Sequence, residues 1–234
     1  MWSGPRNVST AMMYAWRQRP DTTVWDEPMY GHYLLVTGVD HPMRDEVVAA
    51  VPTDRDEILD LMLNGACPTL VWFFKNMAHH LVGFDLAVVD RLENFLLTRD
   101  PRDMLPSLAG GLGRVPEMGD TGFDLQVAIV ERIEQEGRRP LVVDSRLLLD
   151  DPRGVLGELC LRLDLPFHEA MLSWTPGPKV DDGVWASHWY RRLHRSTGFE
   201  AYQPRTDPFP AELQPLLERC LPLYERLTEH AITP

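Results

Sequence analysis

The segment Ser3–Thr10 has the sequence Ser-Gly-Pro-Arg-Asn-Val-Ser-Thr and is followed by a helical pattern of apolar residues. Gly4 permits a tight turn, and the first amides of a helix have no partners within it. These amides and the helix dipole favour an anion. Arg6 adds a guanidinium that can hold two phosphate oxygens, while Ser9 and Thr10 add hydroxyl donors. The segment predicts a phosphate-binding turn, with a simple Ser/Thr helix cap as the alternative.

Four short apolar runs, rich in β-branched and aromatic residues, alternate with helical patterns along the rest of the chain. We expect buried strands over Thr22–Asp26, Thr69–Phe74, Asn94–Thr98 and Leu141–Asp144. Because these runs are apolar at nearly every position, they fit a parallel sheet that is covered on both faces. With a strand before Gly4, they predict a three-layer αβα fold, in the α/β class, with a central, mostly parallel sheet of about five strands.

Helices are expected between these strands, where apolar residues recur with the helical period. They span Ala11–Arg19, Asp54–Leu63 with Thr53 as the N-cap, Phe123–Glu136, and Asp151–Leu163. Only three residues precede Gly4. The first strand is therefore expected to be very short, or the native start to lie upstream of Met1.

The chain is expected to form one domain over 1–234, with a core over 1–167 and a cap and C-terminal helix over 168–234. The stretch Trp174–Pro210 is rich in Pro, Gly, Trp and Arg and has no regular period. Loops of this length in compact proteins usually serve a function. We therefore expect an ordered cap or loop system there.

Composition narrows the classes of partner. The 234 residues are 44% hydrophobic and 25% charged, with a formal net charge of −12. This acidic balance argues against nucleic acid but allows one small anion held by local cations. No run approaches the ~18 apolar residues of a membrane span, and the start lacks the pattern of a signal peptide. We expect a cytoplasmic protein with no nucleic-acid or membrane partner; its oligomeric state stays open, with a homodimer as one alternative.

A second polar segment follows the strand expected over Asn94–Thr98. It has the sequence Arg-Asp-Pro-Arg-Asp-Met-Leu-Pro-Ser and runs from Arg99 to Ser107. The carboxyl ends of parallel strands are where open α/β sheets bind ligands. Pro101 suits the first turn of a helix, which would place Ser107 further along that helix. An ordinary surface ion pair of Arg99 with a nearby Asp is the alternative.

In this order, the two segments resemble the sulfotransferases that use 3′-phosphoadenosine 5′-phosphosulfate (PAPS). The first is similar to the family's 5′-phosphosulfate loop and the second to its 3′-phosphate motif. A third block, VVDSRLLLDDP followed by a helix that ends before Leu-Pro-Phe167, resembles the family's late strand and helix. The resemblance covers residues 1–167. It implies a P-loop-like fold, PAPS as cosubstrate and no metal.

The resemblance also implies roles for single residues. Around the 5′-phosphosulfate it implies Gly4, Pro5, Arg6, Asn7, Ser9 and Thr10. At the 3′-phosphate it implies Arg99 and Ser107. The reaction implied is transfer of the sulfuryl group to a hydroxyl or amine of a small molecule or sugar. Positioning and charge neutralisation would supply most of the catalysis, as in phosphoryl transfer.

The chain departs from the family pattern in two places. Val8 stands at the second loop glycine, and a β-branched residue is expected to avoid a positive φ. The C-terminal R-K-G-x-x-G element has no clear counterpart: Lys179, Gly183 and Trp185 form a loose echo, and Ser196-Thr197-Gly198 is a second candidate. Four aromatic residues in this region fit either an acceptor pocket or a small core of the cap: Trp174, Trp185, Trp189 and Tyr190.

A hydroxyl acceptor needs a group that takes its proton. Glu27 closes the second expected strand, and some sulfotransferases use a Glu at the matching place. Lys75, His79 and His80 follow the third expected strand, where cytosolic sulfotransferases carry a Lys and a catalytic His. We favour Glu27 as the base, with Lys75 polarising the transferring group. Packing roles remain the alternative for the two histidines.

Two other functions stay open. A P-loop kinase is one, although the chain lacks the G-x-x-x-x-G-K-[ST] motif and its phosphate-binding lysine. The other is a catalytically degenerate protein that binds a nucleotide such as 3′-phosphoadenosine 5′-phosphate (PAP), the product of PAPS.

Overall fold

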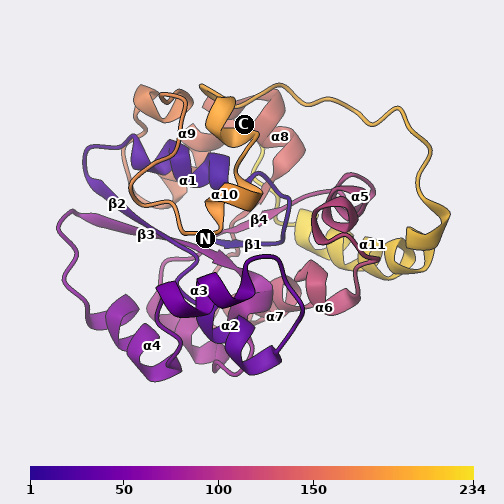
Figure 1. Ribbon diagram of the computed structural model, residues 1–234. Helices are drawn as coiled ribbons and strands as arrows, with labels where there is room; N and C mark the ends of the chain where they lie inside the picture. Colours follow the sequence, from indigo (N-terminus) through magenta and orange to yellow (C-terminus); the bar gives the residue numbers. More distant parts are fainter.

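A computed structural model describes all residues, 1–234, and places five strands in one sheet (Figure 1). The strands are β1 Trp2–Ser3, β2 Thr22–Asp26, β3 Val71–Met77, β4 Leu96–Thr98 and β5 Val142–Asp144. Their spatial order is β2-β3-β1-β4-β5, and every neighbouring pair is parallel. The predicted αβα architecture is confirmed, with a sheet that is entirely rather than mostly parallel.

Eleven α-helices and five short 3₁₀ segments surround the sheet. The helices are α1 Ser9–Arg17, α2 Tyr30–Thr37, α3 Arg44–Ala50, α4 Arg55–Asn64, α5 Pro101–Leu112, α6 Met118–Thr121, α7 Phe123–Gln135, α8 Ser145–Asp150, α9 Pro152–Arg162, α10 Ala186–Trp189 and α11 Gln214–Thr228. The 3₁₀ segments are η1 Ala78–Leu81, η2 Leu86–Arg91, η3 Glu169–Leu172, η4 Leu193–Arg195 and η5 Ala211–Leu213. No helix is both long enough and apolar enough to cross a membrane.

The strands are apolar at successive positions because both faces of the sheet are buried. On one face, Leu96 and Val142 pack with side chains of α4, α5, α7 and α11. On the other, Leu97 and Val143 pack with side chains of α1 and α9. Figure 1 shows α1 and α9 on one side of the sheet and α4 and α7 on the other. Continuous apolar runs are typical of a parallel sheet in this position.

The central strand β1 has only two residues, as expected for a very short first strand, and side chains reinforce it. Trp2 is paired with Asn76 of β3 and Leu96 of β4. Its indole nitrogen donates to Oδ1 of Asn94 at 2.8 Å, and its carbonyl accepts from Nε2 of Gln126 at 3.1 Å. These bonds fix β1 in the middle of the sheet, so the loop after it begins at the centre of the carboxyl edge.

Several boundaries differ from the sequence-based expectations. The third strand is Val71–Met77 and not Thr69–Phe74, so Lys75 lies inside it rather than after it. The N-cap of α4 is Asp54 and not Thr53, because the Asp54 carboxylate accepts from the amide of Glu57. Helix α1 begins at Ser9, two residues earlier than expected, directly after the loop.

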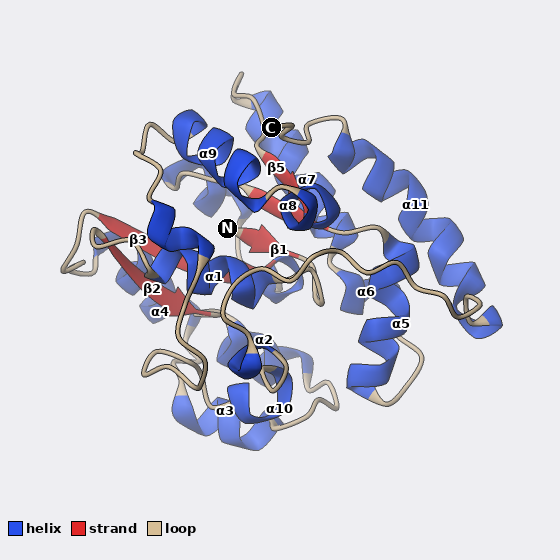
Figure 2. Cartoon of the chain, turned by 90° about the horizontal axis from the view of Figure 1, so that it is seen from above, coloured by secondary structure: helices blue, strands red, loops and turns tan.

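The last third of the chain returns across the carboxyl edge of the sheet. A long loop leads from α10 and η4 to α11, and Figure 2 shows it running across the molecule. Helix α11 then packs against α7 and α5, and Ala231 forms a parallel bridge with Val142 at the β5 edge. The cap residues therefore lie near the ends of the strands that carry the candidate site.

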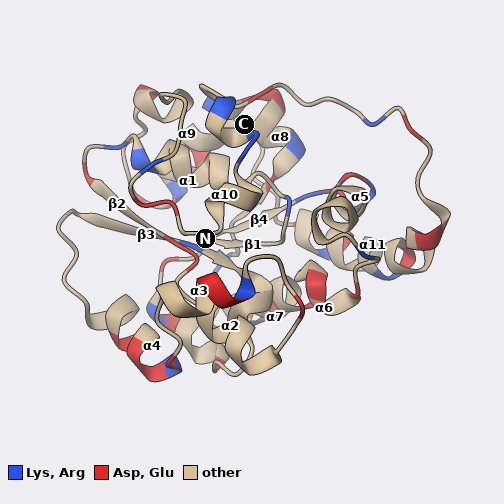
Figure 3. Cartoon of the chain, in the orientation of Figure 1, with Lys and Arg blue, Asp and Glu red and all other residues tan.

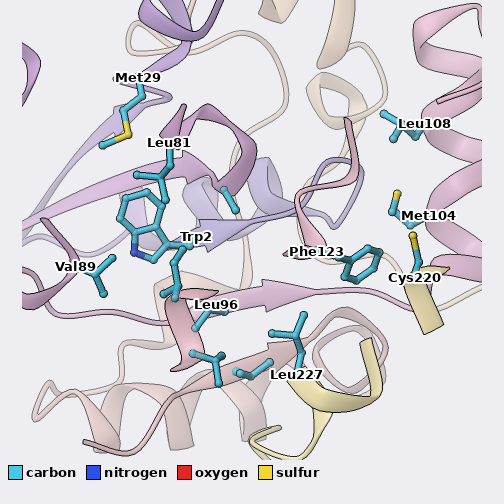
Figure 4. Packing of buried hydrophobic residues seen from close by; sticks show 14 of the residues in the cluster. Trp2, Met29, Leu81, Val89, Leu96, Met104, Leu108, Phe123, Cys220 and Leu227 are labelled. Atoms are coloured by element: carbon cyan, nitrogen blue, oxygen red, sulfur yellow. The ribbon is translucent and has the colours of Figure 1, made fainter. Parts of the chain in front are cut away.

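Core packing predicts a specific loss of stability on truncation of Leu96. This side chain is fully buried and lies among the cluster drawn in Figure 4. Leu96→Ala should lower the free energy of unfolding by about 2–5 kcal/mol, because it removes buried methyl groups and leaves a cavity. Urea denaturation followed by circular dichroism measures this loss. Leu161→Ala, at a side chain that is 71% exposed, should change it by no more than about 0.5 kcal/mol. Equal losses would place Leu96 outside the core.

Candidate active site

A cavity of about 330 Å³ opens at the carboxyl edge of the sheet. Ten of the twelve residues proposed from the sequence line it: Pro5, Arg6, Ser9, Thr10, Glu27, Lys75, His79, His80, Arg99 and Ser107. They come from the loop after β1, the start of α1, the ends of β2, β3 and β4, η1, and α5. The fold thus brings both phosphate segments and the candidate bases to one cavity.

Gly4 and Asn7 do not line the cavity but shape the loop from behind. The Asn7 side chain points into the protein, where its Nδ2 donates to the carbonyl of Leu97 at 3.1 Å. A Cβ atom on Gly4 would lie 2.8 Å from that Nδ2 and 3.1 Å from the carbonyl oxygen of Thr121. Gly4 is therefore required for close packing, and Asn7 ties the loop to β4.

The loop backbone contradicts the expectation for Val8. Both Arg6 and Val8 are left-handed, with φ of 60° and 59°. Such a conformation costs about 1–3 kcal/mol in a non-glycine residue and persists only where the surroundings enforce it. Here Arg99 Nη1 donates to the Arg6 carbonyl at 2.9 Å, and Ser145 Oγ donates to the Asn7 carbonyl at 2.9 Å. These contacts from two other strand ends hold the turn that Val8 completes.

Three arginines give the cavity its positive side. Arg6 makes no salt bridge; its Nε donates to Oγ of Ser107 at 3.0 Å, which joins the two predicted phosphate segments directly. Burial lowers the pKa of Arg6, and the charges of Arg99 and Arg192 lower it further. The carboxylates of Asp103 and Glu200 contact Arg99 and Arg192 respectively. A guanidinium that lines the cavity, has no carboxylate partner and is repelled by two others favours an added anion.

A buried ion cluster lies at the ends of β2 and β3. Nζ of Lys75 donates to Oδ1 of Asp26 at 2.8 Å and also to Oε1 of Glu27. Burial raises the pKa of Glu27 to about 7, against the opposing effect of Lys75 and with a further rise caused by Asp26. Burial opposes the charged form of Lys75, but the two carboxylates outweigh it and raise its pKa. A carboxylate whose pKa is raised in this way is suited to accept a proton, as a general base does.

The cap completes this ion cluster. The hydroxyl of Tyr190 donates to Oδ2 of Asp26 at 2.7 Å and accepts from Nζ of Lys75 at 2.8 Å. Nε1 of Trp185 donates to the same hydroxyl at 3.0 Å. A segment without regular period thus supplies a polar contact to two charges that are almost completely buried. Asp26 was not among the residues proposed from the sequence; its place at the end of a strand, beside Glu27, is the signal that was available.

The two histidines are buried and electrically neutral. Burial lowers the pKa of His79 to about 4 and that of His80 well below its ordinary value. His80 stacks on the rings of Tyr30 and Tyr33, each with a centroid distance of 4.7 Å. Its Nδ1 lies 3.9 Å from Oε2 of Glu27. Both histidines line the cavity, where burial lowers their pKa values but raises that of Glu27.

The C-terminal candidates divide between the cavity and the core. Trp189, Tyr190, Ser196 and Gly198 line the cavity. Trp174 and Trp185 are buried in hydrophobic clusters, and Lys179 bonds to Thr175 in its own loop. The sequence did not single out Arg192, Tyr202 or Asp103. Arg192 and Tyr202 line the cavity. The hydroxyl of Tyr202 donates to Oδ2 of Asp103 at 2.9 Å, and Asp103 in turn contacts Arg99. The basic run Arg191–Arg195 was the signal available for Arg192.

The negative net charge does not conflict with this positive cavity. Figure 3 shows acidic residues on outer helices such as α3 and α4. Charges there are screened over about 10 Å at ordinary ionic strength, so the local arginines decide what the cavity attracts.

Comparison with known proteins assigns the family. A family model described as "Sulfotransferase domain" matches residues 1–231. Two proteins of Arabidopsis thaliana, "Branched-chain-amino-acid aminotransferase-like protein 1" and "Branched-chain-amino-acid aminotransferase-like protein 2", are 37% and 36% identical to the chain over 230 residues. The match covers 98% of this chain but 41% of each relative, so the chain spans about two fifths of the length of these curated relatives.

A solved structure supports the fold. The "Sulfotransferase Domain from the Curacin Biosynthetic Pathway" superposes with a TM-score of 0.58 at 14% identity, covering 100% of this chain and 97% of that one. At this identity the likeness concerns the fold alone. The family match over nearly the whole chain confirms the resemblance drawn from the motifs, and the chain belongs to the sulfotransferase domain family.

Proposed function

We propose that the chain transfers the sulfuryl group of PAPS to a hydroxyl of a small-molecule acceptor. One observation carries this proposal. Three arginines, of which Arg6 has no carboxylate partner, line the same cavity as Glu27, a buried carboxyl group whose pKa is raised to about 7. The first feature suits a donor with several phosphate and sulfate oxygens. The second suits removal of a proton from the acceptor.

The residues present fit the two ends of the donor. The amides at the start of α1, with Arg6, Ser9 and Thr10, suit the 5′-phosphosulfate. Arg99 and Ser107 suit the 3′-phosphate, and Arg192 adds a third guanidinium to the same cavity. The 3.0 Å bond from Arg6 to Ser107 joins these two groups of residues, as one compact nucleotide requires.

The chemistry follows from these positions. Glu27 accepts the proton of the acceptor hydroxyl while the acceptor oxygen forms a bond to sulfur. The bond between sulfur and the oxygen of the 5′-phosphate breaks, and that oxygen leaves with PAP carrying the electron pair. Arg6 stabilises the charge that grows on this oxygen, and Lys75, whose three N–H groups are held by Asp26, Glu27 and Tyr190, contributes through its charge alone. Atoms and charge balance without a metal, oxidant or reductant.

The names of the curated relatives point to a different reaction, aminotransfer. Those proteins are much longer than this chain, which matches 41% of each. Their printed names describe the whole proteins, whereas the family model assigns the matched region. We therefore base the proposed activity on the cavity and the family.

Binding of PAP tests the donor site directly. PAP at a hundredfold excess over its dissociation constant should stabilise the native protein by about 2.7 kcal/mol, because it binds only the folded state. Differential scanning fluorimetry measures the rise in Tm. ATP with magnesium is the comparison for a kinase. A larger shift with ATP than with PAP, or no shift with PAP at millimolar concentration, would overturn the proposed donor.

Arg99 is the test of the 3′-phosphate site. Arg99→Ala should weaken PAP binding by about 1.5–3 kcal/mol, since it removes a charged hydrogen-bond donor. Binding of adenosine 5′-phosphate, which lacks the 3′-phosphate, should fall less, because it loses only the support that Arg99 gives the loop through the Arg6 carbonyl. Isothermal titration calorimetry of both ligands measures the difference. Arg102→Ala, at an exposed arginine of the same segment, serves as the control. Equal losses for the two ligands would place the 3′-phosphate elsewhere.

The pH dependence of turnover tests Glu27 as the base. Because its pKa is raised to about 7, the base is protonated at lower pH, and kcat should rise with pH to a plateau with a midpoint near 7. Glu27→Gln should remove this limb and lower kcat by about 10²–10⁴-fold. Transfer from labelled PAPS measures both effects.

The histidines supply the matched comparison for that profile. The pKa of His79 is lowered to about 4 by burial, so its titration cannot produce a limb near 7. His79→Asn should therefore keep the limb even where it lowers the rate. Loss of the limb in His79→Asn, together with its retention in Glu27→Gln, would identify the histidine as the base. Equal background turnover in wild type, Glu27→Gln and Lys75→Ala, with PAP still bound, would indicate a nucleotide-binding protein without catalysis.

A further inference from the structure

Two contacts hold the guanidinium of Arg6 in place. Arg6 is an exposed residue, and Nε is the one nitrogen of its guanidinium with a hydrogen-bond partner in the protein, Oγ of Ser107 at 3.0 Å. The central carbon of the guanidinium also lies over the indole of Trp189, 5.9 Å from the ring centroid. At such a distance the electron-rich face of an indole attracts a cation. The ring takes up no hydrogen bond, so the two terminal nitrogens of Arg6 stay available to an anion.

Trp189 reaches Arg6 from the cap, at the end of α10, and its indole lies against α5. A Cβ atom at Gly111 of α5 would lie 2.6 Å from Cζ3 and 3.3 Å from Cη2 of the indole, whereas one at Gly110 would meet nothing within 4 Å. Gly111 comes four residues after Ser107, and residues four apart share one face of a helix. The missing side chain at position 111 therefore lets the indole rest on α5 beside Ser107.

Other contacts hold the indole where it is. The ring of His41 meets it with a centroid distance of 5.5 Å, and Nδ1 of His41 is 2.7 Å from the hydroxyl of Tyr30. The amide of Trp189 donates to the carbonyl of Trp185, a buried residue directly before α10. The indole is thus a packed surface on which a cation can rest.

The residue after Trp189 contacts the other half of the site. The buried hydroxyl of Tyr190 accepts from Nζ of Lys75 at 2.8 Å and donates to Oδ2 of Asp26 at 2.7 Å. Two consecutive cap residues therefore contact the loop arginine and the ion cluster. Because Tyr190 is anchored in that cluster, the place of the indole over Arg6 is tied to the ends of β2 and β3.

We propose that Trp189 is a positioning residue for the donor, which holds the Arg6 guanidinium against α5 with its two terminal nitrogens directed to phosphate oxygens. This inference rests on the proposed binding of PAPS, in which Arg6 contacts the 5′-phosphosulfate. An exposed arginine otherwise samples many rotamers, and ordering it when a ligand binds costs free energy. The ring removes part of that cost before the ligand arrives.

A double-mutant cycle on PAP binding tests this role, with isothermal titration calorimetry as the measurement. Trp189→Leu should weaken PAP about fivefold, because leucine keeps an apolar side chain but has no ring face for the guanidinium. Trp189→Phe, which keeps such a face, should stay within about twofold of wild type. In an Arg6→Gln background, Trp189→Leu should change the affinity by less than about twofold, since the two residues act as a unit.

A second measurement needs no ligand. The Nε–H signal of Arg6 in NMR spectra of the ¹⁵N-labelled protein is assigned by its loss in Arg6→Gln, and a nearby ring shifts it. Trp189→Leu should therefore move this signal. Gly111→Ala should move it too, because the added methyl group displaces the indole, whereas Gly110→Ala on the same helix should leave it in place. The Tm of each variant verifies that it is folded, and Gly111→Ala replaces Trp189→Leu in this comparison if the latter does not fold.

The remaining outcomes overturn the inference. An equal loss of PAP affinity with and without Arg6 would mean that Trp189 contacts the nucleotide itself. An unchanged affinity in Trp189→Leu, or a loss in Trp189→Phe as large as that in Trp189→Leu, would exclude support by the ring face. Failure of PAP to bind the wild type contradicts the proposed donor instead. In that case the Arg6 signal still decides the matter, because an identical position in wild type, Trp189→Leu and Gly111→Ala would show that the ring does not hold the guanidinium.

Discussion

The ammonium group of Lys75 is the charge on which the arrangement of the site depends. It lies inside β3, fully buried, between carboxylates from the end of β2 and the hydroxyl of Tyr190 from the cap. Two ions taken from water lose several kcal/mol of hydration each, and good geometry with further hydrogen bonds must offset this loss. Removal of one partner leaves a buried charge unpaired. The end of β2, the end of β3 and the cap are therefore fixed relative to one another.

This constraint explains how one carboxylate keeps a pKa near neutrality beside a lysine. Lys75 divides its hydrogen bonds among Asp26, Glu27 and Tyr190, so its charge is shared and does not hold Glu27 ionised alone. Asp26 adds a second negative charge nearby, which raises the pKa of Glu27 as burial does. The arginine side of the cavity follows the opposite rule. There, Arg6 has no carboxylate partner, and the anionic donor proposed above would supply one.

The fold was largely predictable because its determinants are local. Apolar runs and helical periods fix the elements, and four of the five strands come from such runs. The place of the loop residues and Arg99 at the cavity was predictable for a similar reason: each follows a strand directly, at the edge where parallel sheets bind ligands, and Ser107 lies further along in α5. Strand ends were less accurate. Lys75 is a charged residue inside β3, and its burial depends on partners that lie 48 or more residues away in the sequence.

The parts that sequence reasoning missed share a physical cause. Val8 adopts a positive φ because Arg99 and Ser145, from two other strand ends, hold the carbonyls of the residues before it. Arg192 was not singled out, and Tyr190 and Trp189 were left open between a pocket and a core of the cap, because their segment has no regular period and only the surface they cover gives them a role. A local pattern reports what a residue prefers by itself, whereas these residues are placed by contacts across the carboxyl edge. It follows that motifs identify the loop and strand ends that line the cavity, while the shape of the cavity between them, to which Trp189 and Tyr190 of the cap contribute, requires the folded structure.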